Sequence, residues 1–192
     1  MQKINLIFII LILITSCRSR KLDKIETNKV SDKVKVIELE NSFGVIFPAD
    51  LEVYFLKEND RFTPSEEQIA KVEFEIDKQY LEAQRKFIYD QVYVRTSEVY
   101  GDQEIDKQKA YSDIMESVSK IAKRISKYDR QYVGYVENGK KIILINFIDF
   151  SKDPHNLKKD LANELIGGFH GWFQSNIITQ NFYLKENKLS VY

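Results

Sequence analysis

A β-hairpin is the strongest constraint that the sequence places on the fold. Residues 131–137 and 140–150 are rich in β-branched and aromatic side chains, and Asn138-Gly139 lies between them. Both central residues of a type I′ turn need positive φ, which asparagine and glycine tolerate best. The sequence therefore predicts two long antiparallel strands joined by a two-residue turn.

An amphipathic helix is predicted over residues 63–89. Apolar residues recur there at spacings of three and four, which places them on one face of a helix. These residues are Ile69, Val72, Ile76, Tyr80, Ala83 and Phe87. Thr63 and Glu66 match a capping box, and Pro64 would occupy the first helical position, where its missing N–H does no harm.

A second amphipathic helix is predicted over residues 102–128. Its apolar residues alternate spacings of three and four from Tyr111 to Tyr128. Acidic residues open this segment and basic residues close it, so the charges match the helix dipole at both ends.

Extended chain is predicted on both sides of these elements. Residues 34–40 alternate apolar and polar side chains, but the phase slips at Val36-Ile37, where a bulge would restore one apolar face. Residues 45–47 and 51–56 follow as further extended runs. After Gly167-Gly168, two more strands are expected over residues 169–179 and 181–192, turning near residues 185–188.

This order of elements predicts an α+β domain. Two amphipathic helices would pack on an antiparallel meander sheet, with an additional N-terminal strand pair. Residues 34–192 form this single domain, and the polar residues 17–33 before it are expected to be a flexible tether.

The first 16 residues are typical of a signal peptide. Lys3 supplies a positive start, residues 6–14 are an unbroken apolar run, and Cys17 follows two small polar residues. The run is shorter than the roughly 20 residues that span a bilayer. A secretory signal with an incidental cysteine, or an uncleaved anchor, is the alternative interpretation.

Ile14, Thr15, Ser16 and Cys17 resemble the lipobox of bacterial lipoprotein precursors. The resemblance implies cleavage before Cys17 and acylation of that residue, so that the acyl chains are the protein's contact with the membrane. It also favours an outer-membrane position that faces the periplasm. Two or more acyl chains anchor a protein stably, and Cys17 is the only cysteine, so no intramolecular disulfide competes for its thiol. Residues 131–147 are also similar to a segment of small uncharacterised bacterial lipoproteins, which implies no activity.

Composition excludes several kinds of function. Lys+Arg and Asp+Glu both number 29, so no net charge favours nucleic-acid binding. The two histidines are 15 residues apart, which is no zinc or haem motif, and the seven glycines form no phosphate-binding loop. No cofactor or metal is predicted. Carboxylate pairs such as Glu73 and Asp77 fall on a polar helix face, where charges normally only solvate the helix.

One segment could line a binding site. His170 lies between Gly168 and Gly171, with Trp172 and Phe173 following. Glycines allow close approach and aromatic residues can form pocket walls, although the same residues can simply fill a core.

Two functions are consistent with the sequence. The preferred hypothesis is a non-catalytic envelope domain that binds a partner protein or ligand, including by inhibition, with contacts from His170, Trp172 and Phe173. The alternative is a small envelope hydrolase in which His170 is the base, assisted by Asp149 or Glu164.

Overall fold

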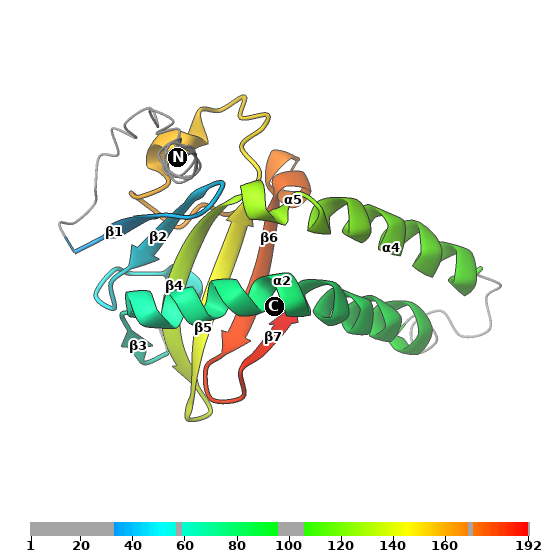
Figure 1. The fold of residues 1–192 in the computed structure, drawn as a ribbon, viewed down its shortest axis with the longest axis horizontal. Coiled ribbons are helices and arrows are strands. Elements are labelled where there is room, and N and C mark those ends of the chain that lie inside the picture. The colour runs from blue at the N-terminus through cyan, green and yellow to red at the C-terminus, as the bar shows by residue number, and fades with distance from the viewer. Residues whose placement is uncertain (1–32, 57–58, 96–105, 169–170, 192) are drawn as a thin grey trace, which may run out of the picture.

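The domain is built on one mixed sheet (Figure 1). The computed structural model describes residues 33–56, 59–95, 106–168 and 171–191. Its strands are β1 (Lys35–Glu38), β2 (Phe43–Phe47), β3 (Arg61–Phe62), β4 (Asp129–Glu137), β5 (Lys140–Ile148), β6 (Ile177–Tyr183) and β7 (Lys188–Val191). They follow the order β1-β2-β4-β5-β6-β7, and β3 also pairs with β4. The α+β class, the meander from β4 to β7 and the N-terminal strand pair are confirmed.

The predicted hairpin forms the centre of the sheet. Strands β4 and β5 pair over all nine residues of each, from Asp129 opposite Ile148 to Glu137 opposite Lys140. Asn138 and Gly139 have φ of 50° and 72°, the positive values that a type I′ turn requires. Strands β2 and β4 pair in parallel, whereas the other strand pairs of the described sheet are antiparallel.

Strand β1 has no bulge. Val36 lies opposite Val45 and Ile37 opposite Gly44 in an unbroken antiparallel register. The phase slip has another cause, because both faces of the sheet are covered: Val36 packs on one side and Ile37 on the other. Apolar side chains are therefore accommodated on both faces of the strand.

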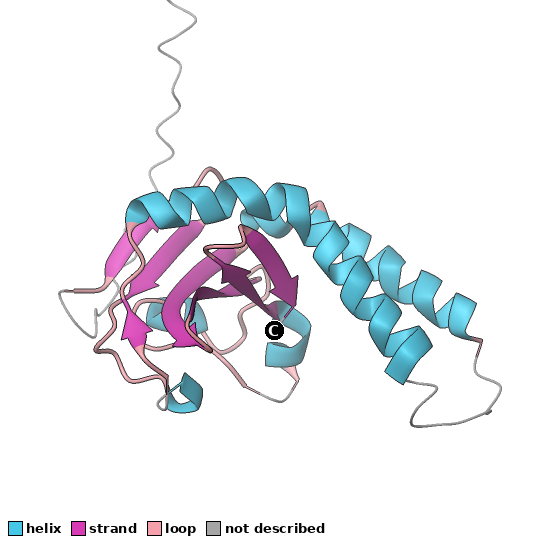
Figure 2. Cartoon of the chain, turned by 90° about the horizontal axis from the view of Figure 1, so that it is seen from below, coloured by secondary structure: helices cyan, strands magenta, loops and turns pink. Residues whose placement is uncertain are grey.

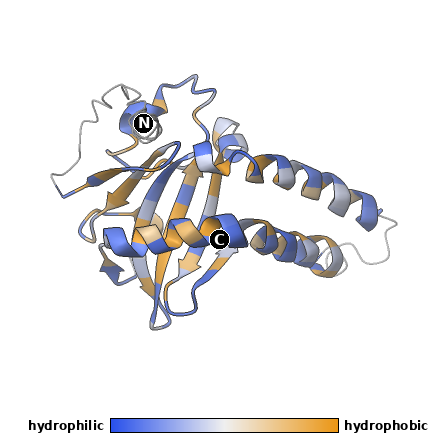
Figure 3. Cartoon of the chain, viewed as in Figure 1, coloured by the Kyte–Doolittle hydropathy of each residue, from blue (hydrophilic) through white to orange (hydrophobic). Residues whose placement is uncertain are grey.

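Two core clusters lie on opposite faces of the sheet. The helix-side cluster joins strand residues such as Ile143 and Ile145 to the helices, and the loop-side cluster joins Leu144 to Leu161 and Ile166. Figure 3 shows hydrophobic residues concentrated along the central strands. The meander is thus buried on both sides, with the two long helices on one of them.

The loop-side cover is held by two buried amide side chains. Gln131 donates to the carbonyls of Leu161 and Glu164 at 2.8 and 2.7 Å and accepts from the Ile166 N–H at 2.9 Å. Asn146 donates to the Ile166 carbonyl at 2.8 Å. Because the covering segment is irregular, these bonds satisfy backbone groups that would otherwise be buried without partners.

Helix α2 (Glu66–Tyr89) crosses the helix-side face of the sheet (Figure 1). Its cap lies two residues beyond the predicted one: Ser65 is the N-cap and forms a capping box with Gln68. The Thr63 hydroxyl instead accepts from the Ala49 N–H at 3.0 Å.

The apolar stripe of α2 changes phase along the helix. Its first four residues, Ile69, Val72, Ile76 and Tyr80, are buried as predicted. Farther on, Gln84 and Ile88 are buried instead, and Phe87 is 40% exposed. The change occurs where α2 passes the last strand and packs beside α4 (Figure 2). A π-helix, η2 (Asp90–Arg95), extends α2.

Helix α4 (Lys107–Ala122) begins at Asp106, whose side chain accepts from the Lys109 N–H at 2.9 Å. It ends earlier than predicted, and the 3₁₀-helix η3 (Ile125–Lys127) leads into β4. Predicted helical residues 102–105 lie outside the described residues. We call η2, α4 and the C-terminal half of α2 the arm, because Figure 2 shows these helices projecting beyond the sheet.

Three short helices replace predicted extended chain or lie in loops. Residues 51–56 contain the 3₁₀-helix η1 (Tyr54–Leu56) instead of a strand. Helix α5 (Trp172–Asn176) occupies most of the strand expected over residues 169–179, and β6 begins only after it. The 3₁₀-helix η4 (Leu157–Asp160) belongs to the loop-side cover. None of the helices in the described part of the chain is long and apolar enough to cross a membrane.

Candidate functional site: a groove at the sheet edge

The predicted contact residues lie on the loop-side face or outside the described structure. Cys17 and His170 are outside the described residues. Trp172 stacks on Phe150 at 5.9 Å between ring centroids and meets Phe173 edge-on at 5.6 Å. Its indole N–H donates to the Lys152 carbonyl. Trp172 and Phe173 are only partly exposed and pack against the loop-side cluster.

Asp149, one proposed acid partner of His170, already has other partners. Its carboxylate lies 2.7 Å from Arg124 and accepts from the Ser151 N–H at 2.9 Å. Burial raises the pKa of Asp149, but the Ser151 hydrogen bonds, the Arg124 charge and a hydrogen bond from Tyr128 outweigh it, so the pKa lies below its usual value. Glu164, the other proposed partner, is exposed. Asp149 thus connects the segment after α4 to the end of β5.

A buried charged cluster fastens α2 to the sheet. The Glu73 carboxylate lies 3.1 Å from Arg130 Nε and accepts from the Tyr132 hydroxyl at 2.6 Å. Burial raises the pKa of Glu73, although Arg130 and Tyr132 oppose that shift. Arg130 is 3% exposed and also donates to the Ser42 hydroxyl at 2.8 Å. Its contacts are all internal, which is typical of a structural ion pair.

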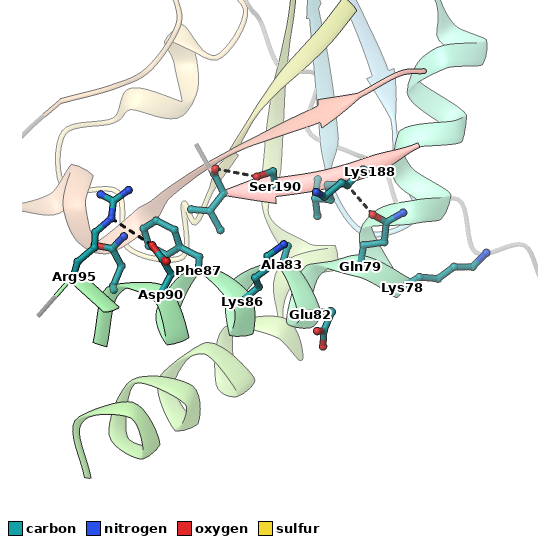
Figure 4. A pocket seen from close by; sticks show the side chains of 13 residues that line it. Lys78, Gln79, Glu82, Ala83, Lys86, Phe87, Asp90, Arg95, Lys188 and Ser190 are labelled. Atoms are coloured by element: carbon teal, nitrogen blue, oxygen red, sulfur yellow. Dashed lines mark hydrogen bonds and ion pairs between the residues drawn. The ribbon is translucent and has the colours of Figure 1, made fainter. Parts of the chain in front are cut away.

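A groove of about 480 Å³ opens between the arm and strand β7 (Figure 4). We call it the edge groove. Helix α2 and η2 form one wall and β7 forms the other. Its lining residues are Lys78, Gln79, Glu82, Ala83, Lys86, Phe87, Asp90, Gln91, Arg95, Lys188, Leu189, Ser190 and Val191. Its volume falls within the range of ligand sites.

The backbone of β7 is exposed to this groove because β7 is the last strand of the sheet. Gln79 covers part of that edge: its amide donates to the Asn187 carbonyl at 2.9 Å and accepts from the Leu189 N–H at 2.8 Å. Exposed strand edges are commonly protected in this way against unwanted pairing. Gln79 protects only the beginning of β7.

The charge of the groove is positive. Four cationic side chains and two carboxylates line it. Asp90 pairs with Arg95 at 3.3 Å, and Glu82 pairs with Arg85 outside the groove at 2.7 Å. Within the described residues, no carboxylate forms an ion pair with Lys86 or Lys188. These two lysines therefore leave an uncompensated positive charge on the two walls.

Three tyrosines form a cluster on the arm. Tyr89 stacks on Tyr93 at 4.8 Å, and Tyr111 of α4 approaches Tyr93 at 5.7 Å. Tyr89 is 55% exposed.

A second groove of about 420 Å³ lies between α2 and the end of α4, lined by Asp77, Tyr80, Leu81, Ser119, Ala122, Lys123 and Ile125. The arm thus presents concave and apolar surface on two sides of α2.

The function is not indicated by a metal site in the described residues or by similarity to known proteins. Among the described residues, no group of three or more His, Cys, Asp or Glu side chains could hold a metal ion. No protein-family model, curated protein or solved structure matches the chain significantly. The function is therefore inferred from the groove.

The groove residues were not predicted from the sequence. Lys86 and Lys188 are about a hundred residues apart, and each alone is typical of a solvated surface. The predicted apolar stripe does reach the groove: Phe87, near the end of α2, is 40% exposed there.

Proposed function

We propose that this chain is a lipid-anchored protein of the bacterial envelope whose domain binds a partner protein or ligand without catalysis. The lipobox residues that end at Cys17 support the anchor, with the outer membrane and the periplasm as the expected location. The edge groove supports the binding role. It combines an open strand edge, the exposed Phe87 and two lysines that have no ion-pair partner among the described residues.

Site-specific photo-crosslinking in intact cells tests the binding role. A benzophenone amino acid at position 83, where Ala83 lines the groove, is expected to give a discrete adduct. The matched control carries it at Lys159, an exposed residue of η4 on the loop side. The same adduct at equal yield from both positions would contradict binding in the groove.

The Cys17→Ala variant tests the anchor in the same cells. Without acyl chains the protein is expected to leave the membrane fraction, because the anchor is the only membrane contact proposed. Labelled palmitate should enter the native chain and not the variant. Cys17→Ala protein that stays in the membrane fraction to the same extent as the native chain would refute lipid anchoring.

A further inference from the structure

We infer that the edge groove binds an extended, acidic segment of another protein, which adds to β7 as a parallel strand. This inference rests on the proposed binding function and specifies its ligand. The hydrogen-bond pattern of Gln79, the direction of the free groups of β7 and the charge of the groove support it.

The Gln79 amide imitates one residue of a neighbouring strand. In a parallel pair, a residue donates its N–H to one carbonyl of the adjacent strand and accepts from the N–H two residues farther on. Gln79 makes these two bonds, to the Asn187 carbonyl and from the Leu189 N–H, at 2.9 and 2.8 Å. The edge of β7 is therefore already arranged to pair with an amide.

The next amide position along β7 faces the groove. Successive residues of a strand point their backbone groups to opposite sides, so groups two residues apart point the same way. The Leu189 N–H points away from β6, toward Gln79. Hence the Leu189 carbonyl and the Val191 N–H also point outward, and both residues line the groove. Together they can bind the N–H and the carbonyl of one residue of an incoming strand, as the Asn187 carbonyl and the Leu189 N–H bind the Gln79 amide.

The side chains of the groove select the ligand's composition. Lys86 on α2 and Lys188 on β7 have no carboxylate partner among the described residues, so they favour glutamate or aspartate. Phe87 is 40% exposed in the same groove and offers an apolar contact. Side chains alternate along a strand, so a segment with alternating acidic and apolar residues fits best.

Fluorescence anisotropy with the full chain in detergent tests this inference. The probe is a fluorescein-labelled ten-residue peptide of alternating valine and glutamate, and the control peptide has lysine in place of glutamate. We expect the glutamate peptide to bind at least about ten-fold more tightly. The double variant Lys86→Glu, Lys188→Glu should remove or reverse this preference. Equal binding of the two peptides would overturn the acidic assignment.

Val191→Pro tests the backbone contact. Proline removes the outward N–H without removing a bond to β6, and edge strands tolerate it. We expect about ten-fold weaker binding of the glutamate peptide, whereas Val191→Ala, which keeps the N–H, should bind within about two-fold of the native chain. Circular dichroism and the urea midpoint establish that the variant is folded.

N-methylation of the peptide gives an independent test that leaves the protein unchanged. Methylated alternate amides cannot donate to the Leu189 carbonyl, so binding should fall by at least about ten-fold. Unchanged binding of this peptide, or of Val191→Pro, would overturn strand addition. A position-83 adduct in cells combined with no peptide binding would refute the strand-addition inference alone. Absence of the adduct as well would refute the proposed function too.

Discussion

The sheet and the arm use the same kinds of side chain in different ways. The sheet is covered on both faces, and its central strands bury isoleucine, leucine and phenylalanine completely. The arm consists of two helices packed side by side, and it leaves Phe87, Tyr89, Val94 and Ile114 exposed. Apolar residues stabilise the fold in the sheet, whereas on the arm many of them remain available for contact with other molecules.

This difference separates stability from binding. A core residue with neighbours on all sides costs much to remove, while a residue on a single helix pair loses few contacts. The edge groove lies at the boundary of the two regions, with β7 supplied by the sheet and α2 by the arm. Variants on either side of this boundary should therefore have effects of very different size.

The largest effect is expected in the sheet. Ile145 is completely buried in the helix-side cluster, so Ile145→Ala should lower the free energy of unfolding by about 2–5 kcal/mol. Ile114→Ala is the matched change on the arm, where the residue is 42% exposed, and should cost at most about 0.5 kcal/mol. Urea unfolding followed by circular dichroism measures both. Similar losses for the two variants would show that the arm is as well packed as the sheet.

A smaller, local effect is expected within the arm. Tyr111 makes edge and tilted contacts with Tyr89 and Tyr93 at 6.4 and 5.7 Å. Tyr111→Ala should weaken the packing of α4 by about 1 kcal/mol, seen as about five-fold faster hydrogen exchange of α4 amides. Tyr111→Phe keeps the ring and should exchange like the native chain. Equally accelerated exchange in β4 and β5 would mean that the arm and the sheet unfold together.

The smallest effect on stability is expected at Asp149, where the end of β5 contacts the segment after α4, and this effect depends on pH. Because the pKa of Asp149 is lowered in the folded state, its ionised form stabilises the fold above the usual pKa of 3.8, and this contribution is lost as the pH falls through the lowered value. Asp149→Asn should reduce stability at pH 7 by about 1 kcal/mol or less, since Arg124 is largely exposed.

The difference in urea midpoint between the native chain and Asp149→Asn, measured from about pH 7 to pH 3, checks this sign. It should shrink toward the acid end. A difference that stays constant or widens on acidification would rule out an ionised Asp149 as the source of the stabilisation.

Local patterns predicted the elements of the fold where one interaction decides the conformation. Asn138-Gly139 fixed the turn because few residues accept positive φ at both positions. The start of α2 was misplaced because Thr63 and Ser65 both open a capping pattern. The choice depends on the Ala49 N–H, which is distant in sequence and occupies the Thr63 hydroxyl.

Patterns that depend on what covers a surface were harder to interpret. The slip at Val36-Ile37 indicated a bulge only if one face of the sheet were buried. The second face is covered by the loop-side segment that contains η4, which lies far from β1 in the sequence. The edge groove was hard to predict for the same reason, because it forms only where α2 packs beside β7. No local pattern near Lys86 or Lys188 predicts that contact.

The length of α2 has a mechanical consequence. It is one continuous helix of 24 residues, about 36 Å long, and it begins over β1, where Lys35 pairs with Glu66. Glu73 clamps it to β4, and its far end carries the wall of the groove. A load on the groove wall is therefore expected to reach the Glu73–Arg130 contact through the backbone hydrogen bonds of α2.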